Sequence, residues 1–319
     1  SFMRADEVPW KLQCVRTGAT YSGLEVRYRS DEGETLDVVH DFEAANETFN
    51  RDTFDQRLAS KSPLDRSGVW RFRELILPVS PDLPVTKPEG NTNVYHSNAI
   101  ADFVGLESFP LKHEGENPTG SFKDRGMTVG ITVAKMLGMH RVACASTGNT
   151  SASMAAYAAQ AGMQAFVFVP EGNIAYGKLS HALAYGAITI QLTGNFDRAM
   201  HLVQEVCARE GIYLLNSVNP FRIEGQKAIG FELLQDLHWE VPDWIVLPGG
   251  NLGNNVALSK GLLELRDLGI IDKVPRIAVI QAAGANPLYR AYRDQKLVEP
   301  LTSAETIATA IRIGDPVSW

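Results

Sequence analysis

The chain has 319 residues, of which 45% are hydrophobic and 21% are charged, and its formal net charge is −7. This balance is typical of a soluble globular protein with one or two domains, and it excludes an intrinsically disordered chain. The negative charge argues against nucleic acid as a partner, and no apolar stretch reaches the roughly 20 residues that a membrane-spanning helix requires.

The first 110 residues contain few clear patterns. Leu36–Asp41 has the pattern of a strand, and Asp52–Ala59 has the pattern of a short helix. Pro78–Pro88 contains four prolines, and it predicts an extended connector because proline fixes φ and cannot donate a backbone hydrogen bond. Strong periodic signals therefore begin only beyond this connector.

From residue 140 onward, short apolar runs alternate with amphipathic segments of helix length. The predicted helices include Phe196–Glu210 and Gly225–Leu237. The alternation is typical of βαβ units, so it predicts an α/β fold with parallel sheet, helices on both faces, and ligands at the carboxyl ends of the strands. The predicted strands are Arg141–Ser146, Ala165–Val169, Ala187–Leu192, Tyr213–Asn216, Trp244–Leu247 and Arg276–Gln281.

The segment Glu116–Gly126 leads from turn-forming residues into a Ser-Phe-Lys-Asp-Arg cluster, and helical periodicity follows it. We expect Lys123 at the start of a helix, where the partial positive charge of the helix dipole disfavours protonation of its amine. An amine must be neutral to attack an aldehyde, so a lowered pKa suits a lysine that bonds to a carbonyl carbon. The alternative is a solvated surface cluster, which is where most lysines lie.

A second polar loop, Ser146–Ser153, follows a predicted strand and opens an alanine-rich helix. Gly148 allows a tight turn there, and hydroxyl and amide groups at a helix start can bind a carboxylate or phenolate oxygen. The alternative is ordinary helix capping. Capping requires only one such residue, whereas six of these eight residues carry a hydroxyl or an amide group.

A third loop, Pro248–Asn255, follows the strand Trp244–Leu247 and precedes a helix that is predicted to begin near Val256. Successive backbone N–H groups of a Gly-rich turn at a helix start form a cradle for phosphate. The loop lacks the Lys-Ser/Thr ending of a P-loop, and the chain has no G-x-G-x-x-G pattern, so neither a nucleoside triphosphate nor a dinucleotide is expected. A plain strand-to-helix connection is the alternative.

The three loops together supply an activatable lysine, a platform of hydroxyl and amide groups, and a phosphate cradle, all at junctions between strands and helices. Pyridoxal 5'-phosphate (PLP) requires that set, because its aldehyde, its ring oxygen and its phosphate each need one of these partners. We therefore expect Lys123 to hold PLP as a Schiff base.

The sequence also resembles a known family, the threonine synthases, which are PLP-dependent enzymes of fold type II. The resemblance extends from about Glu89 to the end of the chain. It implies two parallel-sheet-containing domains with helices on both faces, as in the β-subunit of tryptophan synthase. Related dehydratases usually have an almost all-glycine phosphate loop, which asparagines interrupt here. The segments that carry the resemblance are Asn117–Gly126, Ser146–Ser153, Asn216–Arg222, Glu224–Lys227 and Gly250–Asn254.

The resemblance implies a PLP-dependent lyase that converts O-phospho-L-homoserine and water to L-threonine and phosphate. It assigns Lys123 to the Schiff base and to proton transfer at Cα and Cβ, and Asn149 to the 3'-oxygen of PLP. The substrate carboxylate is assigned to Ser146, Asn149 and Thr150. The substrate phosphate is assigned to Thr150, Ser217, Arg222 and Asn251, since a guanidinium suits a phosphate. The cofactor phosphate is assigned to the backbone of Gly250, Asn251, Leu252, Gly253 and Asn254.

The resemblance also predicts a cofactor cleft between two domains. Residues 120–212 are expected to form the smaller α/β domain. Residues 1–119 are expected to be the N-terminal part of the large domain, and residues 213–319 its α/β part with the phosphate loop. Members of the family continue beyond the segment that matches Ala310–Trp319, so we expect this chain to be truncated at its C-terminus.

Two other functions stay open at this point. A serine/threonine dehydratase-like deaminase has the same core but no substrate phosphate to bind, and a truncated relative could bind PLP without catalysis. Cys14 lacks the paired cysteine of the zinc site that some relatives carry, and the three cysteines are far apart, so we expect no metal. We expect a reduced, cytoplasmic protein that binds a small anionic substrate, with neither nucleic acid nor membrane as a partner; a homodimer is compatible with the sequence.

Overall fold

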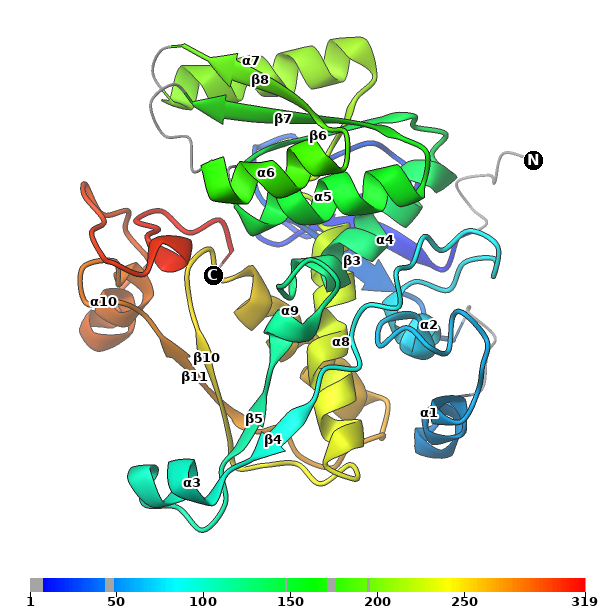
Figure 1. Ribbon diagram of the computed structural model, residues 1–319, viewed down its shortest axis with the longest axis vertical. Helices are drawn as coiled ribbons and strands as arrows, with labels where there is room; N and C mark the ends of the chain where they lie inside the picture. Colours follow the sequence, from blue (N-terminus) through cyan, green and yellow to red (C-terminus); the bar gives the residue numbers. More distant parts are fainter. Residues whose placement is uncertain (1–7, 44–48, 147, 171–175, 194–195, 319) are drawn as a thin grey trace.

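The computed structural model describes residues 8–43, 49–146, 148–170, 176–193 and 196–318 (Figure 1). Its upper half in that view is built on a four-stranded parallel sheet with the strand order β8-β7-β6-β9. Valine, isoleucine and phenylalanine recur in these strands, as expected for a parallel sheet that is buried on both faces. The strands are β6 (Arg141–Ala145), β7 (Gln164–Pro170), β8 (Ile188–Leu192) and β9 (Tyr213–Leu214).

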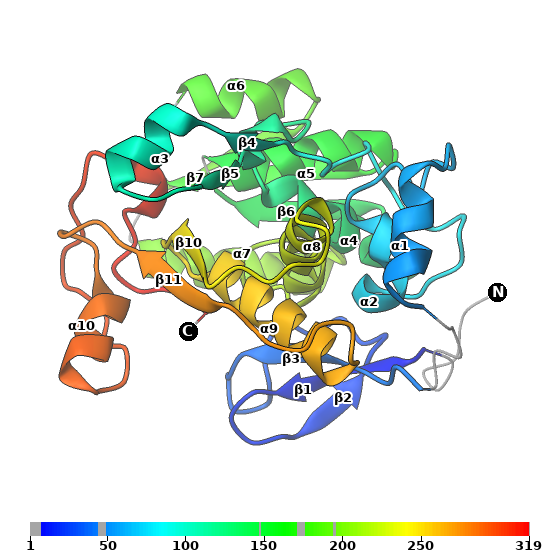
Figure 2. The same cartoon turned by 90° about the horizontal axis from the view of Figure 1, so that it is seen from below.

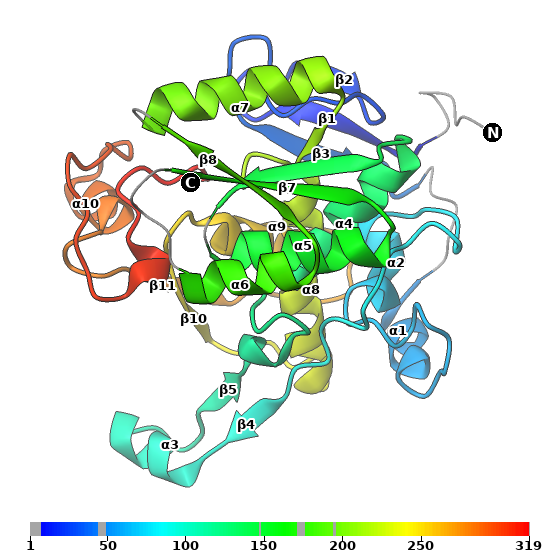
Figure 3. The ribbon, with the colours of Figure 1, turned by 45° about the horizontal axis from the view of Figure 1, so that its top comes forward.

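Helices cover both faces of this sheet (Figure 3). Helices α5 (Asn149–Gln160) and α6 (Tyr176–Ala184) lie on one face, and α7 (Phe196–Glu210) lies on the other. Successive residues of β6 alternate accordingly, because Val142 belongs to the apolar core that contains α5, whereas Ala143 packs in the cluster that contains α7. The predicted α/β fold with parallel sheet and helices on both faces is confirmed.

The lower half of the molecule in Figure 1 contains two long helices and a second, smaller sheet. Its elements are α8 (Phe221–Asp236), β10 (Trp244–Pro248), α9 (Gly253–Asp267), β11 (Arg276–Ile280), α10 (Pro287–Asp294) and the 3-10 turn η3 (Thr309–Ile311). Helix α4 (Lys123–Met136) contacts both α5 and α8. Helix α8 packs against α4 on one side and against α9 on the other. Strands β10 and β11 form a parallel pair.

The N-terminal region, which the sequence pattern left poorly defined, contributes two antiparallel sheets and several short helices. The sheet of β1, β2 and β3 lies beside α9 (Figure 2), and β4 pairs with β5 as a hairpin. The elements are β1 (Trp10–Cys14), β2 (Thr20–Ser22), β3 (Leu36–His40), α1 (Arg51–Leu58), η1 (Trp70–Phe72), α2 (Arg73–Ile76), β4 (Val94–His96), α3 (Asn98–Val104), β5 (Pro110–Lys112) and η2 (Glu114–Glu116).

A buried ion network connects the N-terminal sheet to α8 and α9. The Nζ of Lys260 in α9 donates to Oδ1 of Asp37 in β3 (2.7 Å), and Lys260 also pairs with Glu224 of α8. Glu224 is further bound by His40 of β3 (Nε2 to Oε2, 2.6 Å) and by Lys227. Although burial raises the pKa of Glu224, the ammonium groups of Lys227 and Lys260 hold it below its ordinary value. The network therefore keeps this carboxylate charged and fixes the N-terminal sheet against two central helices.

One part of this network has the residue types of a metal site. The donor atoms of His40, Glu224 and Glu264 lie within 4.8 Å of one another. Lys227 bonds to both carboxylates, at 2.7 Å in the case of Glu264, so an ammonium already neutralises them. The expected absence of a metal stays a prediction. Among the residues that the structure describes, no helix has the length and apolar character needed to cross a membrane.

The predicted strands after residue 140 are confirmed, with ends that differ by one or two residues. Two predicted helix starts are wrong. Helix α8 begins at Phe221 and not at Gly225, because the side chain of Asn219 accepts a hydrogen bond from the backbone N–H of Phe221 (3.1 Å). Helix α9 begins at Gly253 and not near Val256, directly after a residue in the left-handed conformation. With these bounds, Arg222 lies in the first turn of α8, and Gly253 and Asn254 lie in the first turn of α9. The division into domains at residues 120 and 213 stays a prediction.

Helices α4 and α8 cross at a distance that only glycine permits. A Cβ atom on Gly225 of α8 would overlap the carbonyl oxygen of Arg125 and would lie 2.9 Å from the Cα of Gly126. A Cβ on Gly126 would in turn lie 2.7 Å from the carbonyl oxygen of Arg222. The two backbones therefore touch directly, and neither can move away without separating the residues at the helix starts.

We predict that Gly225→Ala lowers the free energy of unfolding by at least about 2 kcal/mol, because its methyl group meets backbone atoms that cannot rotate away. Gly230→Ala on the same helix is the matched control. Its Cβ would lie 2.8 Å from Cδ1 of Leu258, which is a flexible side chain, and alanine gains up to about 1 kcal/mol in helix propensity. Urea denaturation of both variants is the measurement, and equal losses of stability would contradict a glycine-dependent crossing.

Candidate active site

Lys123 is the first residue of α4, as the sequence predicts. Its side chain is half-buried, and its Nζ lies 4.6 Å from the centre of the Phe122 ring. Burial and, after it, the positive charge of Arg222 lower the pKa of the Lys123 amine to about 7. The helix start adds a partial positive charge that acts in the same direction. A large fraction of this amine is therefore neutral at neutral pH and can attack a carbonyl carbon.

Asp124, the next residue, fixes the start of α4 to its surroundings. Its carboxylate accepts hydrogen bonds from the backbone N–H and the hydroxyl of Thr119 (2.7 and 2.6 Å) and from the hydroxyl of Ser153 on α5 (2.5 Å). Burial raises the pKa of this carboxyl above its ordinary value, and these bonds partly offset the effect. Because Ser153 lies in the second turn of α5, one carboxylate sets the relative position of the starts of α4 and α5.

The start of α5 has hydrogen-bond donors that the protein leaves unused. The backbone N–H groups of Asn149, Thr150 and Ser151 have no acceptor among the described residues. Ser146, Asn149 and Thr150, the three residues predicted to bind a carboxylate, are each half-buried. Thr147, another member of the predicted loop, lies outside the described residues. The described members are thus grouped at one helix start, where free N–H groups favour an anion.

Asn216 joins the loop of Ser217 to the loop of Ser146. Strand β9 ends at Leu214, but the side chain of Asn216 continues its pairing with β6. Its Oδ1 accepts from the backbone N–H of Ala145 (2.9 Å), and its Nδ2 donates to the carbonyl oxygen of Ala145 (3.1 Å). Ser146 directly follows Ala145, and Ser217 directly follows Asn216. The two hydrogen bonds therefore hold the two loops together. The sequence pattern does not reveal this role, because it places Asn216 at the end of a strand.

Arg222 is buried in the first turn of α8 without a counter-ion. It is 2% exposed, its Nη1 donates to the carbonyl oxygen of Leu215 (3.0 Å), and its Nε has no hydrogen-bond partner. No carboxylate of the described residues pairs with it. Burial lowers the pKa of Arg222 to about 10, which leaves it charged at neutral pH. By contrast, Arg125, which is equally buried, pairs with Glu114 (2.5 Å) and Glu232 (2.9 Å).

The burial of Arg222 has an energetic consequence. Removal of an ion from water costs several kcal/mol even in a real protein interior, unless a partner of opposite charge compensates. Arg222 has only one carbonyl oxygen as a partner, so the burial of its charge lowers the stability of the ligand-free protein. We interpret this unpaired guanidinium as one half of an anion site. Its burial also excludes a solvated surface position for this side chain.

The loop between β10 and α9 presents a row of free backbone donors. Leu252 adopts a left-handed conformation with φ of 64°, and the N–H groups of residues 250–255 have no acceptor among the described residues. A Cβ on Gly253 would lie 3.6 Å from Ile223 and 3.8 Å from Gln226, so the loop lies against the first turns of α8. The oxygens Asn254 Oδ1 and Gln226 Oε1 are buried without a donor. Such a row of N–H groups at a helix start fits a phosphate.

The C-terminal segment covers this loop. A Cβ on Gly250 would lie 3.2 Å from the Cα of Ile311 and 3.3 Å from the carbonyl oxygen of Ala310. The backbone N–H of Ser318 donates to the carbonyl oxygen of Asn251 (3.2 Å). A larger residue at position 250 would therefore press against the backbone of residues 310 and 311. The sequence could not indicate this contact, because the two segments are far apart along the chain.

The starts of four helices meet at this site. Asp124 connects α4 to α5, Arg222 packs along α4 at Gly126, and Ile223 lies beside Gly253 of α9. No hydrogen bond or ion pair joins Lys123 to residues 250–254 within the described part of the chain. Each helix start contributes partial positive charge, so the arrangement favours a ligand with more than one anionic group. PLP fits these residues, since a near-neutral lysine suits its aldehyde and the free N–H groups suit its phosphate.

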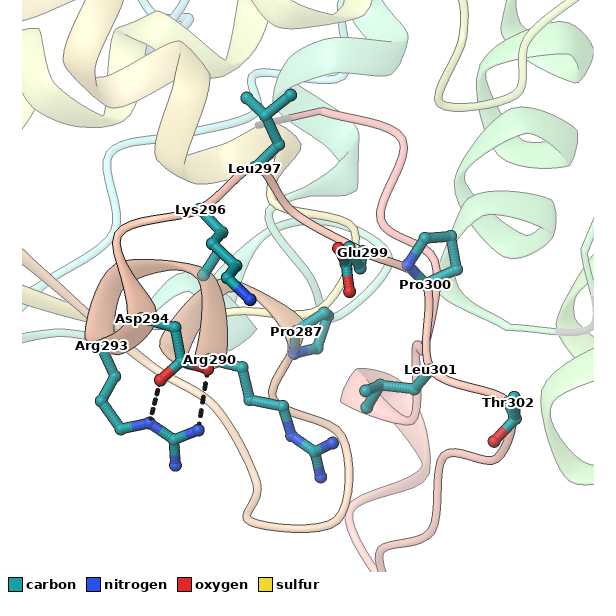
Figure 4. Close-up of a pocket in the computed structure, with 11 residues that line it drawn as sticks. Pro287, Arg290, Arg293, Asp294, Lys296, Leu297, Glu299, Pro300, Leu301 and Thr302 are labelled. Carbon is teal, nitrogen blue, oxygen red and sulfur yellow. Dashed lines mark hydrogen bonds and ion pairs between the residues drawn. The ribbon is translucent and has the colours of Figure 1, made fainter.

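Two cavities, each of about 320 Å³, lie elsewhere. The first is lined by α10 and the segment that follows it, where Arg293 pairs with Asp294 (Figure 4). The second is lined by residues that include Arg71, Asn91 and Asp236. None of the predicted site residues lines either cavity, so neither cavity is the site at the helix starts.

Comparisons with known proteins find related sequences and a similar fold. A family model described as "Pyridoxal-phosphate dependent enzyme" matches residues 85–319. The threonine synthases of Methanocaldococcus jannaschii and Methanosarcina acetivorans are each 46% identical to this chain, over 96% and 97% of it and 74% of each relative. The solved structure of threonine synthase from Escherichia coli has a TM-score of 0.67 and 18% identity, and the match covers 97% of this chain and 72% of that one.

We predict that Arg222→Met raises the free energy of unfolding of the ligand-free protein by about 1–4 kcal/mol, because it replaces an uncompensated charge with an apolar side chain of similar length. Arg125→Met is the matched control, and it should lower stability by about 3–5 kcal/mol because it breaks a buried ion pair with Glu114 and removes one of the cations that compensate Glu232. Thermal denaturation with and without inorganic phosphate is the measurement. Phosphate should stabilise the wild type more than Arg222→Met, in which the N–H groups of residues 250–255 can still bind it; a loss of stability in Arg222→Met without phosphate would contradict an anion site.

Proposed function

We propose a specific reaction for this chain, which belongs to the pyridoxal-phosphate dependent enzymes and, within them, to the threonine synthase family. The chain is accordingly a PLP-dependent lyase. The proposed reaction converts O-phospho-L-homoserine and water to L-threonine and phosphate. The proposal assigns a role to each polar group at the four helix starts.

Bound PLP would supply an electron sink for negative charge that develops on the substrate. In this proposal Lys123 holds the cofactor covalently and then carries a proton at Cα and Cβ of the substrate, which a pKa near 7 suits because the amine can both accept and release a proton. The N–H groups of residues 250–254 bind the cofactor phosphate, and Asn149 donates to the ring oxygen. Ser146, Asn149 and Thr150 bind the substrate carboxylate.

The observation that carries the proposal is the unpaired, buried guanidinium of Arg222. A substrate that brings its own phosphate supplies the missing counter-ion, and Thr150, Ser217 and Asn251 are proposed to complete its hydrogen bonds. Two phosphates in one site repel each other, and the repulsion at a few ångströms is strong in a region of low dielectric. A fixed guanidinium offsets that repulsion and binds phosphate with a fork of N–H groups.

The deaminase alternative does not account for Arg222. A dehydratase that acts on serine or threonine has no second phosphate in its site, so a buried cation there would destabilise the protein without a compensating ligand. The lowered pKa of the Lys123 amine suits covalent binding of PLP with or without catalysis, so turnover of the substrate decides against the non-catalytic alternative. The geometry therefore supports a phosphate-bearing amino acid as the substrate.

The proposal includes closure of a cleft between two domains, with residues 120–212 as the smaller domain. Lys123 and Asn149 belong to helices that flank the four-stranded sheet, whereas the phosphate loop connects the second sheet to α9. Movement of one unit toward the other would exclude water from the reacting carbon atoms, which protects a carbanionic substrate from premature protonation. The apolar ring of Phe122 beside Lys123 supports a site that is dry when closed.

We predict that Lys123 is the residue that holds the cofactor. Borohydride reduction of the PLP-loaded protein, followed by peptide mapping, should find the pyridoxyl group on Lys123, because its lowered pKa makes it more nucleophilic than an exposed lysine. Lys123→Ala should remain folded and lose the visible absorbance of bound PLP. A label on Lys112, which is bound to Glu232 (2.8 Å), or on Lys178 would end the assignment.

We predict that Arg222→Ala lowers turnover of phosphohomoserine by about 30- to 1000-fold, which corresponds to the roughly 2–4 kcal/mol of a charge-assisted contact. PLP content should not change. Arg222→Lys should recover only part of the activity, since a point charge cannot reproduce the guanidinium fork.

The experiment is made on the protein that includes any further C-terminal region of the natural sequence, and steady-state rates are measured with phosphohomoserine, serine and threonine. Equal rates on serine or threonine for wild type and Arg222→Ala, together with no activity on phosphohomoserine in either protein, would favour the deaminase instead.

A further inference from the structure

We propose that Asn216 is a positioning residue for the reaction, and that its side-chain amide holds the guanidinium of Arg222 at a fixed place relative to the loop of Ser146. The inference rests on the proposed function in one respect, namely that Ser146 and Arg222 bind the two ends of one substrate. It goes further, because it assigns part of the substrate selection to a residue that acts only through its neighbours.

The argument begins with the register of the sheet. Strands β6 and β9 pair in parallel, with Ala143 opposite Leu214. The N–H of Leu215 extends this ladder by one bond, since it donates to the carbonyl oxygen of Ala143 (2.8 Å). In a regular parallel pair, the carbonyl oxygen of Leu215 would then accept the next bond from the N–H of Ala145. Both groups have other partners here.

The side chain of Asn216 takes the place of that ladder bond. Its Oδ1 accepts from the N–H of Ala145 (2.9 Å), and its Nδ2 donates to the carbonyl oxygen of Ala145 (3.1 Å). The carbonyl oxygen of Leu215 is therefore left for Arg222, whose Nη1 donates to it (3.0 Å). One amide group thus decides which partner this carbonyl oxygen has.

The backbone between β9 and α8 gives the arrangement little freedom. The carbonyl oxygen of Asn216 accepts from the N–H of Asn219 (3.0 Å), so the chain turns away from the sheet at this point. Asn219 is fully buried, and its Nδ2 donates to the carbonyl oxygen of Leu214 (2.9 Å). The N–H of Arg222 donates to the carbonyl oxygen of Asn219 (3.3 Å). Ser217 lies within this turn, so two of the groups that are proposed to bind the substrate phosphate are anchored to β9.

The bond to Leu215 also determines which edge of the guanidinium remains available. It occupies Nη1 of Arg222, whereas Nε is buried without a hydrogen-bond partner, and Nη2 has none among the described residues. The Nε–H and one N–H of Nη2 point in the same direction, and together they form a two-donor edge that matches two oxygens of a phosphate. Without its anchor the long side chain can rotate, and a bidentate contact depends on a fixed orientation of the fork.

The same amide is connected to the other end of the substrate site. Ser146, which is assigned to the substrate carboxylate, directly follows Ala145. Asn216 therefore ties the carboxylate loop and the anchor of Arg222 to one peptide group of β6. Two anion-binding groups at a fixed separation favour a substrate of matching length, and a displacement of about 1 Å can cost roughly 100-fold in rate. The arrangement thus favours phosphohomoserine over O-phospho-L-serine, which is one carbon atom shorter.

The test uses the PLP-loaded protein, in which the cofactor phosphate occupies the loop of residues 250–255 and added inorganic phosphate binds at Arg222. Thermal denaturation at a series of phosphate concentrations, against chloride of equal ionic strength, gives an apparent Kd. Asn216→Ala should raise this Kd about 10-fold, because the N–H of Ala145 then takes the carbonyl oxygen of Leu215 and Arg222 loses its anchor. In an Arg222→Met background, Asn216→Ala should have no further effect on the Kd.

Tyr28→Phe is the matched control. The hydroxyl oxygen of Tyr28 accepts from the N–H of Leu214 (2.7 Å), so this variant also removes a side-chain acceptor from the backbone of β9, but away from Arg222. It should lower the Tm and leave the phosphate affinity unchanged. Asn216→Thr has a side chain that suits a strand and lacks the amide. It carries the same prediction as Asn216→Ala, so the test does not depend on the folding of one variant.

A second experiment measures the release of phosphate from phosphohomoserine and from O-phospho-L-serine. Asn216→Ala should lower the ratio of the two kcat/KM values about 10-fold, and Tyr28→Phe should leave it unchanged. A merely structural role of Asn216 would lower the Tm and both rates together, and the ratio would stay as it is. An unchanged ratio would therefore overturn the role of Asn216 in substrate selection.

The two experiments distinguish this inference from the proposed function. Unchanged phosphate affinity in Asn216→Ala would overturn the inference even if the wild type converts phosphohomoserine, and so would a wild type that does not respond to phosphate. A protein that does not convert phosphohomoserine, but whose phosphate affinity depends on Asn216 only while Arg222 is present, would refute the proposed reaction and retain the positioning role.

Discussion

The direct contact of α4 with α8 is the constraint on which the site depends. At Gly126 and Gly225 the two helices approach without intervening side chains, and interiors of native packing density have little freedom to adjust such a contact. The crossing lies within the first turns of both helices, so it fixes Lys123 relative to Arg222. Asp124 then fixes α5 to the same place through Ser153. Small residues at one crossing therefore determine where the chemically active side chains lie.

The same arrangement has a cost in stability. Helix starts that meet add partial positive charges, and Arg222 adds a full one without a counter-ion. A fold optimised for stability alone would place a carboxylate or an apolar side chain there, as the pairing of Arg125 with Glu232 illustrates. A site that is unfavourable when empty binds an anion more strongly, because the ligand relieves a penalty that the folded chain already carries. Ligand binding and folding are linked for this reason.

The sequence could predict what depends on local pattern. Strands after residue 140, the helix Phe196–Glu210 and the position of Lys123 at a helix start all follow from apolar periodicity and turn residues, and the structure confirms them. The predicted start of α8 is wrong, because the hydrogen bond that Asn219 accepts from the backbone N–H of Phe221 outweighs the weak helix signal of a Pro-Phe-Arg stretch. The burial of Arg222 could not be predicted either. It depends on α4, a segment about 100 residues earlier, and no local pattern records that contact.

Local motifs and the three-dimensional fold determine different properties of the site. Motifs such as Ser146–Ser153 identify which residues can bind a carboxylate or a phosphate, because hydroxyl and glycine patterns are local. The electrostatic relation between Lys123 and Arg222 is a property of the fold, since it arises from a helix crossing and from the absence of a carboxylate among the described neighbours.

A relative could keep every motif residue and still place an acidic side chain beside Arg222. Its lysine would then be more basic in the empty site. The basicity of Lys123 therefore depends on the charges around it as well as on the motif that contains it.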